Sequence, residues 1–437
     1  IKFFLSLIIS SLRNEDYSFM IRIQLLFILL SPVSLLWSQD STAVQRLSLQ
    51  EADALFLNNN LSLLVESLQI EAEKAAVIQS KLYPNPTFST EFNLRDPEHN
   101  KFFHVGRSGQ KYIELEQLLI LGGKRKTSID LAKKDAQIAT VFFEKLLLQL
   151  KYQLHTSLFE SQLHWDLIQH YERQLEMMVL LIKQMDTQAQ KGNIAMKEVV
   201  RLKSLLLQLN NEKSGLWQTY LEKQRELKIL LHTDQTIVFD LNDEIFSNFQ
   251  KILDHKDIQK TFLEKAPDFI LEQVFLEKAV LQVQLEKKQR LPDVKFKVNY
   301  DQLSGAFKNE INGGISFDLP FLNTNRGNIL KSKIELEQAN VRVNSTTHQL
   351  QISLQSSLMK YENAIKEYQQ MRNIYFSDFE QILKGMHDNF QNRNISLLEY
   401  VDFLESYNQS QMEILRIKLQ LIESSEALNV LTGSNLI

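Results

Sequence analysis

The chain has 437 residues, 44% of them hydrophobic and 23% charged, with 12 Gly, 7 Pro and no Cys. So few chain-breaking residues predict a small number of long elements, and they argue against a nucleotide-binding α/β enzyme, which needs glycine-rich loops. A formal net charge of -4 offers no overall attraction for nucleic acid. The lack of Cys excludes disulfides, thiolate metal sites and a lipid-bearing cysteine.

Residues 1–38 are expected to be an upstream extension followed by a signal peptide. Met20 is the expected start, Ile23–Leu30 supplies an apolar stretch after a basic residue, and Ser34–Ser38 supplies a cleavage region. The chain is therefore predicted to be exported; a retained N-terminal membrane anchor is the alternative, because two bulky residues lie in the cleavage region. After residue 40 no apolar run approaches the ~18 residues of a spanning helix, so any further membrane crossing would be made by strands.

The two halves of the chain carry the same landmarks in the same order. Residues 81–85 (KLYPN) match 289–293 (QRLPD), each where a predicted helix ends and a strand begins. Residues 193–200 (NIAMKEVV) match 394–401 (NISLLEYV) without a gap. Each repeat is predicted to contain a helix, two strands and two long helices. The predicted boundaries are 39–235 for the first repeat, 236–255 for a connecting segment and 256–437 for the second repeat.

The long helices are predicted from an apolar pattern that follows a coiled-coil rhythm. In the first repeat its positions are Ile129, Ala132, Ala136, Ala139, Phe143, Leu146 and Leu150. A helix from Thr127 to about Lys191 would be about 100 Å long. A soluble coiled-coil scaffold would explain such helices equally well, so the strands must discriminate between a scaffold and a membrane protein.

Four segments, two in each repeat, alternate apolar with polar or charged residues. The positions predicted to face lipid are Phe88, Phe92, Val294, Phe296, Val298, Ile311, Ile315 and Phe317. One apolar and one polar face is what a transmembrane barrel strand requires. Because a closed barrel needs about eight strands, the barrel would be shared between chains. Two chains would give eight strands and three would give twelve; the sequence does not choose, although a water-filled duct needs the larger number.

Several short segments, in their order along the chain, resemble the TolC-like outer-membrane efflux factor family (outer membrane efflux protein). They are LQEA at 49–52, NNNL at 58–61, YPNP at 83–86, LGGKR at 121–125 and the two Asn-Ile turns. The resemblance covers nearly everything after the signal peptide. It implies a mainly α fold with a β-barrel contribution, in which a homotrimer forms a twelve-stranded barrel and a long helical tunnel. The LGGKR segment is also similar to the heavy-metal-efflux branch of the family.

This resemblance implies a passive exit duct in the outer membrane with a long periplasmic helical portion. Its partners would be a periplasmic adaptor protein, an inner-membrane pump of the resistance-nodulation-division type and outer-membrane lipid, and its cargo metal cations or drugs. The main alternative is an exported coiled-coil structural or adhesion protein. A periplasmic adaptor is a second alternative, against which the duplication argues.

Each repeat has a turn between its two long helices. The purely structural interpretation of both turns is a helical hairpin with an Asn cap. The resemblance implies that these tips contact the adaptor. The tip residues are Lys191, Gly192, Asn193, Ile194 and Ala195 in the first repeat and Arg393, Asn394, Ile395 and Ser396 in the second. The family usually has Gly at both tips, whereas the second tip here has Arg393.

Glu399 and Asp402 follow the second tip and lie three residues apart, so they share one helix face. Their equivalents in the first repeat are Glu198 and Arg201. Solvated acids in the first turn of a helix are the simpler interpretation, because the helix dipole favours them. The resemblance implies instead a periplasmic gate in which three chains bring six carboxylates together.

No motif of an enzyme, a cofactor site or a metal site is recognisable. His155, His164 and His170 are expected at the surface or between helices, since none has a helical neighbour in ligand spacing. Met177 and Met178 are expected to pack in the helical seam. We therefore predict no catalytic residue, no cofactor and no metal ligand.

Overall fold

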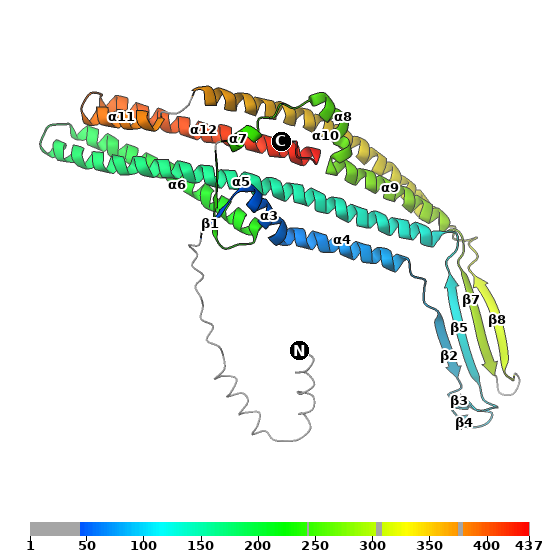
Figure 1. Ribbon diagram of the computed structural model, residues 1–437. Helices are drawn as coiled ribbons and strands as arrows, with labels where there is room; N and C mark the ends of the chain where they lie inside the picture. The colour runs from blue at the N-terminus through cyan, green and yellow to red at the C-terminus, as the bar shows by residue number, and fades with distance from the viewer. Residues whose placement is uncertain (1–43, 243, 303–307, 375–378, 437) are drawn as a thin grey trace, which may run out of the picture. The chain divides into compact units, whose positions relative to one another are not determined.

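The computed structural model describes residues 44–242, 244–302, 308–374 and 379–436 (Figure 1). The predicted extension and signal peptide at 1–38, including Met20, lie outside the described residues. Within the described ranges, no helix combines the length and the apolar character needed to cross a membrane.

The first half of the described chain contains helices and short strands in alternation. Its elements are β1 (Val44–Leu47), α3 (Leu49–Asn59), α4 (Leu61–Ser80), β2 (Thr87–Phe92), β3 (Arg95–Asp96), β4 (Lys101–Phe102), β5 (Lys111–Leu119), α5 (Lys124–Gln190) and α6 (Met196–Leu231). The 67 residues of α5 confirm the predicted long helix and correspond to about 100 Å.

The second half follows a similar order. Its elements are β6 (Thr236–Phe239), α7 (Ile245–Asn248), α8 (His255–Lys265), α9 (Pro267–Lys288), β7 (Val294–Gln302), β8 (Glu310–Phe317), α10 (Arg326–Ile374), α11 (Phe379–Gln391) and α12 (Leu397–Thr432). In each half, the helix predicted to precede the strands is divided into two, α3 and α4 in one half and α8 and α9 in the other.

Two different local devices break these helices. Asn60 ends α3 and caps α4: its side-chain oxygen accepts the Leu63 N–H at 3.0 Å, and its Nδ2 donates to the Leu230 carbonyl of α6 at 2.9 Å. Asn60 is 6% exposed, so the break is fixed against α6. In the second half, Pro267 begins α9 directly after Ala266, because Pro fits the first helical position but lacks the N–H that a continuous helix requires.

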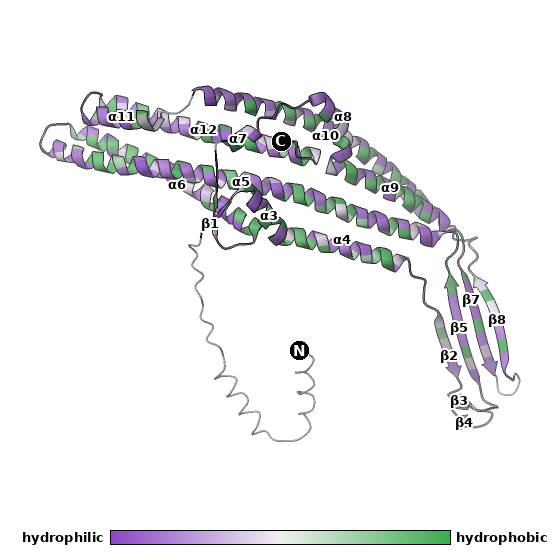
Figure 2. Ribbon diagram, in the orientation of Figure 1, coloured by the Kyte–Doolittle hydropathy of each residue, from purple (hydrophilic) through white to green (hydrophobic). Residues whose placement is uncertain are grey.

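The helices pack side by side around α5, which contacts α4, α6, α9 and α12, while α10 contacts α9 and α12 (Figure 1). Figure 2 shows hydrophobic and hydrophilic residues interleaved along these helices, as expected of seams that face neighbouring helices. In the predicted seam of α5, Ala139 is buried and the other positions are partly buried.

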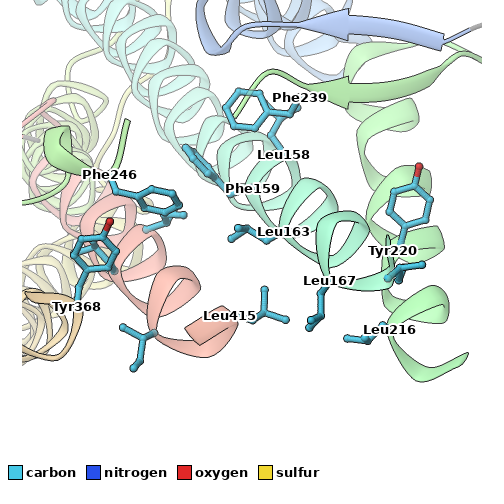
Figure 3. Packing of buried hydrophobic residues seen from close by; sticks show 14 of the residues in the cluster. Leu158, Phe159, Leu163, Leu167, Leu216, Tyr220, Phe239, Phe246, Tyr368 and Leu415 are labelled. Atoms are coloured by element: carbon cyan, nitrogen blue, oxygen red, sulfur yellow. The ribbon is translucent and has the colours of Figure 1, made fainter. Parts of the chain in front are cut away.

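The main core runs through several of the packed helices, and one part of it lies where α5 meets the segment that connects the two halves (Figure 3). Phe159 of α5 is fully buried, and its ring meets that of Phe239 edge to face at 4.9 Å. Phe239 ends β6, which pairs in parallel with β1, and Phe246 of α7 stacks on Tyr368 of α10. The connecting segment is therefore part of the core rather than a loose linker.

Candidate functional site

The four predicted strands form one antiparallel sheet in the order β2, β5, β7, β8 (Figure 1). Leu115 of β5 lies opposite Phe88 of β2 on one side and opposite Val298 of β7 on the other. Farther across the sheet, Phe296 lies opposite Ile315 of β8. Directly opposed residues point to the same face, and residues alternate along each strand. The register therefore gathers all eight positions predicted to face lipid on one face of the sheet.

These apolar side chains are exposed to an unusual degree. Phe88 is 65% exposed, Ile311 76% and Ile315 62%, and Val294 alone among the eight positions is partly buried. A contiguous exposed apolar surface of this kind marks contact with another apolar body, either protein or lipid.

The opposite face of the same sheet is polar and charged. Lys295 Nζ lies 3.1 Å from the Glu116 carboxylate and Lys297 Nζ lies 3.8 Å from that of Glu114, each pair linking β5 with β7. Since β5 belongs to the first half of the chain and β7 to the second, these contacts also join the two predicted repeats. The sheet thus has one apolar and one charged face, and β2 and β8 form its two edges.

The segment LGGKR joins the sheet to the helices. Both Gly122 and Gly123 have a φ of 70°, and a Cβ on Gly122 would lie 2.6 Å from Leu291 Cδ1. Lys124 Nζ reaches the Asp293 carboxylate at 2.8 Å, and the Arg125 guanidinium lies 3.9 Å from the centre of the Tyr83 ring. Gly122 and Lys124 therefore connect the two halves of the chain where the strands give way to the helices, whereas Arg125 contacts its own half.

The two hairpin tips have the same backbone geometry despite their different residues. Gly192 has a φ of 77° and Arg393 a φ of 61°, so both occupy the left-handed region. The next residue, Asn193 or Asn394, donates its N–H five residues back, at 3.0 and 2.8 Å. This is the helix ending that usually selects Gly. The predicted difference between the tips is therefore one of side chain and not of backbone path.

Glu399 and Asp402 are both exposed at the start of α12. Glu399 accepts the Ser396 N–H at 2.7 Å, and the Ser396 hydroxyl accepts the Glu399 N–H at 3.2 Å, which completes a capping box. The hydrogen bond from the Ser396 backbone lowers the pKa of Glu399. Within one chain, Glu399 therefore has a defined structural role as the partner of Ser396 at the start of α12.

His155 is held by carboxylates that sequence reasoning missed. It lies on α5 with 5% exposure, its Nε2 2.8 Å from Asp53 of α3 and its Nδ1 2.6 Å from Glu426 of α12. Burial alone would lower the pKa of His155, but the hydrogen bonds with Asp53 and Glu426 raise it to about 9. His155 therefore lies between helices, one of the two places expected for it, and its partners gave no signal in the sequence because they are 271 and 102 residues away.

The other histidines and methionines to which the sequence analysis assigned no metal-binding role pack between helices. His164 is buried and its Nδ1 lies 2.7 Å from the Glu160 carbonyl, while His170 Nδ1 lies 2.9 Å from Arg173. Met178 is 1% exposed in the main core, which confirms its predicted packing role.

The polar loop between β2 and β5 also contains structure that the sequence did not predict. β3 and β4 form a small hairpin within it, and the ligand atoms of Asp96, His99 and His104 lie within 4.8 Å of one another. The signal in the sequence was an aspartate followed by two histidines over nine residues, but the loop has no regular period that would place them together.

Solved structures of membrane proteins, two of them outer membrane channels, match this arrangement. A membrane protein from Pseudomonas aeruginosa matches with a TM-score of 0.72 and 15% identity, covering 90% of this chain and 92% of its own. The Campylobacter jejuni CmeC outer membrane channel matches with a TM-score of 0.66 and 17% identity, covering 89% and 86%. The open state of the Neisseria gonorrhoeae MtrE outer membrane channel matches with a TM-score of 0.65 and 14% identity, covering 89% of both chains.

The chain has the TolC-like fold. No family model and no curated protein matches the sequence, so the likeness lies in the structure.

Proposed function

We propose that this chain belongs to the TolC-like outer-membrane efflux family and is the exit duct of a tripartite efflux pump. It would conduct substrate passively from an inner-membrane pump of the resistance-nodulation-division type, through a periplasmic adaptor, to the outside. The observation that carries this proposal is the register of the sheet, which collects eight predicted lipid-facing positions on one face and the charged side chains on the other. A packing hairpin in a soluble scaffold has no need for such a face.

The same sheet supports a barrel shared between chains. Its edge strands, β2 and β8, present backbone groups that need partners, and these are costly to leave without hydrogen bonds in lipid. We propose that β8 of one chain pairs with β2 of the next, so that three chains close a twelve-stranded barrel. The charged face would then line a water-filled lumen, and the apolar face would contact the lipid of the outer membrane.

The helices would continue this barrel into the periplasm as a tunnel. With 67 residues, α5 alone is long enough to extend well beyond a membrane about 30 Å thick. The two tips would form its far end and dock the helical hairpin of the adaptor, through residues 191–195 and 393–396. Because the tips share one backbone geometry, we propose that both contact the adaptor, with Arg393 adding a positive charge at the second.

At this end, Glu399 and Asp402 of three chains would form a ring of six carboxylates. The hydrogen bonds from Ser396 keep Glu399 ionised, so the ring would retain negative charge at neutral pH. Such a ring attracts cations and binds multivalent cations that obstruct the passage. We therefore propose these two acids as the periplasmic gate.

The cargo would be metal cations or drugs. The similarity of LGGKR to the heavy-metal branch does not favour metals, because both basic side chains serve internal contacts: Lys124 pairs with Asp293 in the other half of the chain, and Arg125 stacks on Tyr83 in its own half. The pump encoded beside this chain would identify the class of cargo.

Fractionation tests the duct directly. Outer membranes are washed with high salt and with carbonate, and the protein is then extracted in mild detergent. We expect it to remain in the membrane fraction and to migrate as a trimer. Recovery as a soluble monomer or dimer would refute the duct and favour an exported coiled-coil structural or adhesion protein.

A further inference from the structure

We propose that Asp96, His99 and His104 bind one divalent transition-metal ion, with Zn²⁺ as the best fit. Asp96 Oδ2 lies 2.8 Å from His99 Nδ1 and 2.6 Å from His104 Nδ1, so the three ligand atoms form one cluster in which a bound ion would replace the hydrogen bonds to the carboxylate. The two imidazole rings lie 5.1 Å apart at 65° to each other, which lets both Nδ1 atoms approach the same oxygen. The site lies in the loop between β2 and β5, away from the proposed gate, and does not depend on the proposed duct.

The backbone of the loop orients the carboxylate. Asp96 Oδ1 accepts the N–H groups of Glu98 and His99 at 3.0 and 3.2 Å, which leaves Oδ2 directed at the imidazoles. The hairpin of β3 and β4 pairs Asp96 with Lys101 and thereby returns the chain toward His104. The three ligands, although spread over nine residues, are thus placed by local hydrogen bonds.

A further hydrogen bond supports His104 in the manner usual for a metal ligand. Its Nε2 lies 3.1 Å from the Ser108 hydroxyl. When Nε2 carries the proton and donates it to that oxygen, Nδ1 presents a lone pair to a metal ion. An ion that displaces the proton from His104 Nδ1 would therefore find Ser108 placed to accept the proton on Nε2.

The loop around the site is anchored to β7. Gln302, which is 5% exposed, donates from Nε2 to the carbonyls of Gly106, Arg107 and Gly109 at 2.8, 2.9 and 3.1 Å. Gly109 packs directly on His104: a Cβ at Gly109 would lie 1.9 Å from the His104 carbonyl oxygen. Because these contacts fix the loop, little ordering would be needed when an ion binds.

The ligands and their exposure define the ion. Two imidazole nitrogens and one carboxylate oxygen suit Zn²⁺ and Cu²⁺, whereas Mg²⁺ and Ca²⁺ prefer oxygen ligands alone. The side chains of Asp96 and His104 are 4% and 6% exposed, but that of His99 is 43% exposed, so an ion could enter from solvent on the His99 side. Water would fill the fourth position.

The experiment uses the full chain without a polyhistidine tag, purified in mild detergent and stripped with a chelator. It is dialysed against ZnCl₂ alone, and the bound metal is measured by elemental analysis. We expect about one ion per chain at saturation, retained in excess Mg²⁺. Binding of no ion, or displacement of the ion by Mg²⁺, would overturn the proposal.

Matched variants locate the ion. His99→Ala should lose it, and because this side chain is partly exposed the helical circular dichroism should stay unchanged. Ser108→Ala should keep the ion but weaken binding about 10–100-fold. His348→Ala, an exposed histidine on α10, should bind as the unaltered chain does. With Cu²⁺ as the probe, electron paramagnetic resonance should detect two nitrogen ligands in the unaltered chain, and this signal should be lost in His99→Ala. Equal binding in His99→Ala would show that the ion lies elsewhere and refute the site.

Discussion

The buried ion pairs of His155 predict a specific dependence of stability on pH. Two carboxylates contact this histidine, Asp53 from α3 and Glu426 from α12. The neighbouring charge on α5 is Lys151, whose Nζ lies 3.0 Å from the Asp53 carboxylate. The pKa of His155 is about 9 in the fold against 6.5 for an unperturbed histidine, and each tenfold change in proton affinity corresponds to 1.36 kcal/mol. The charged histidine therefore contributes about 3 kcal/mol to the free energy of unfolding.

The sign of the effect follows from the raised pKa. The contribution is fully present below pH 6.5, where the histidine is charged in both folded and unfolded chains, and is lost as pH rises toward 9. In His155→Gln this term disappears, because glutamine does not titrate. Between pH 6.5 and 9 we therefore expect the unaltered chain to lose about 3 kcal/mol more stability than His155→Gln.

The assay is urea unfolding followed by helical circular dichroism, at fixed protein and detergent concentrations and at several pH values. A double-mutant cycle with Glu426→Gln separates the pair from the effect of each truncation. At neutral pH, His155→Gln alone should be destabilised by about 3–5 kcal/mol, since it leaves buried carboxylates without their cation, and Glu426→Gln should recover part of that loss. Equal pH slopes for the unaltered chain and His155→Gln would refute the reasoning.

Three further predictions concern the sheet, the second tip and the gate. In a membrane-insertion assay, Phe296→Lys should reduce the stability of the inserted protein by about 2–4 kcal/mol per chain if the residue lies near the bilayer midplane. Lys297→Gln, on the opposite face, should be tolerated in the same assay. Equal tolerance of both changes would mean that the strands do not lie in a membrane. Arg393→Gly should raise the free energy of unfolding by about 0.5–1 kcal/mol, because Gly adopts a positive φ without steric cost; no gain in thermal unfolding would contradict this account of the tip. In bilayer recordings of the reconstituted trimer, the double variant Glu399→Gln with Asp402→Asn should show weaker cation selectivity and weaker block by multivalent cations. The trimer should stay intact, because Gln still completes the capping box. Unchanged selectivity and block would place these acids outside the lumen.

The sequence by itself determined the features that depend on local periodicity. Alternation along Val294–Gln302 identified a strand with two different faces, and the coiled-coil rhythm after Thr127 identified α5 to within a few residues. The two Asn-Ile turns marked the hairpin tips. A side-chain period is a property of neighbouring residues, so it can be recognised before any tertiary contact is known.

Tertiary structure decided which of these surfaces meet. The pairing of β5 with β7 set the common face of the sheet, because register depends on contacts between residues nearly 200 positions apart and no local pattern specifies it. The breaks in the predicted first helices, at Asn60 and Ala266, were settled by packing against α6 and by Pro267. The partners of His155 come from α3 and α12, and the loop of Asp96 closes through a hairpin too short for its period to be recognised. Charged groups and ligands that lie far apart in the sequence or in irregular loops can form ion pairs and binding sites only when they lie close together. The folded chain alone determines which of them do.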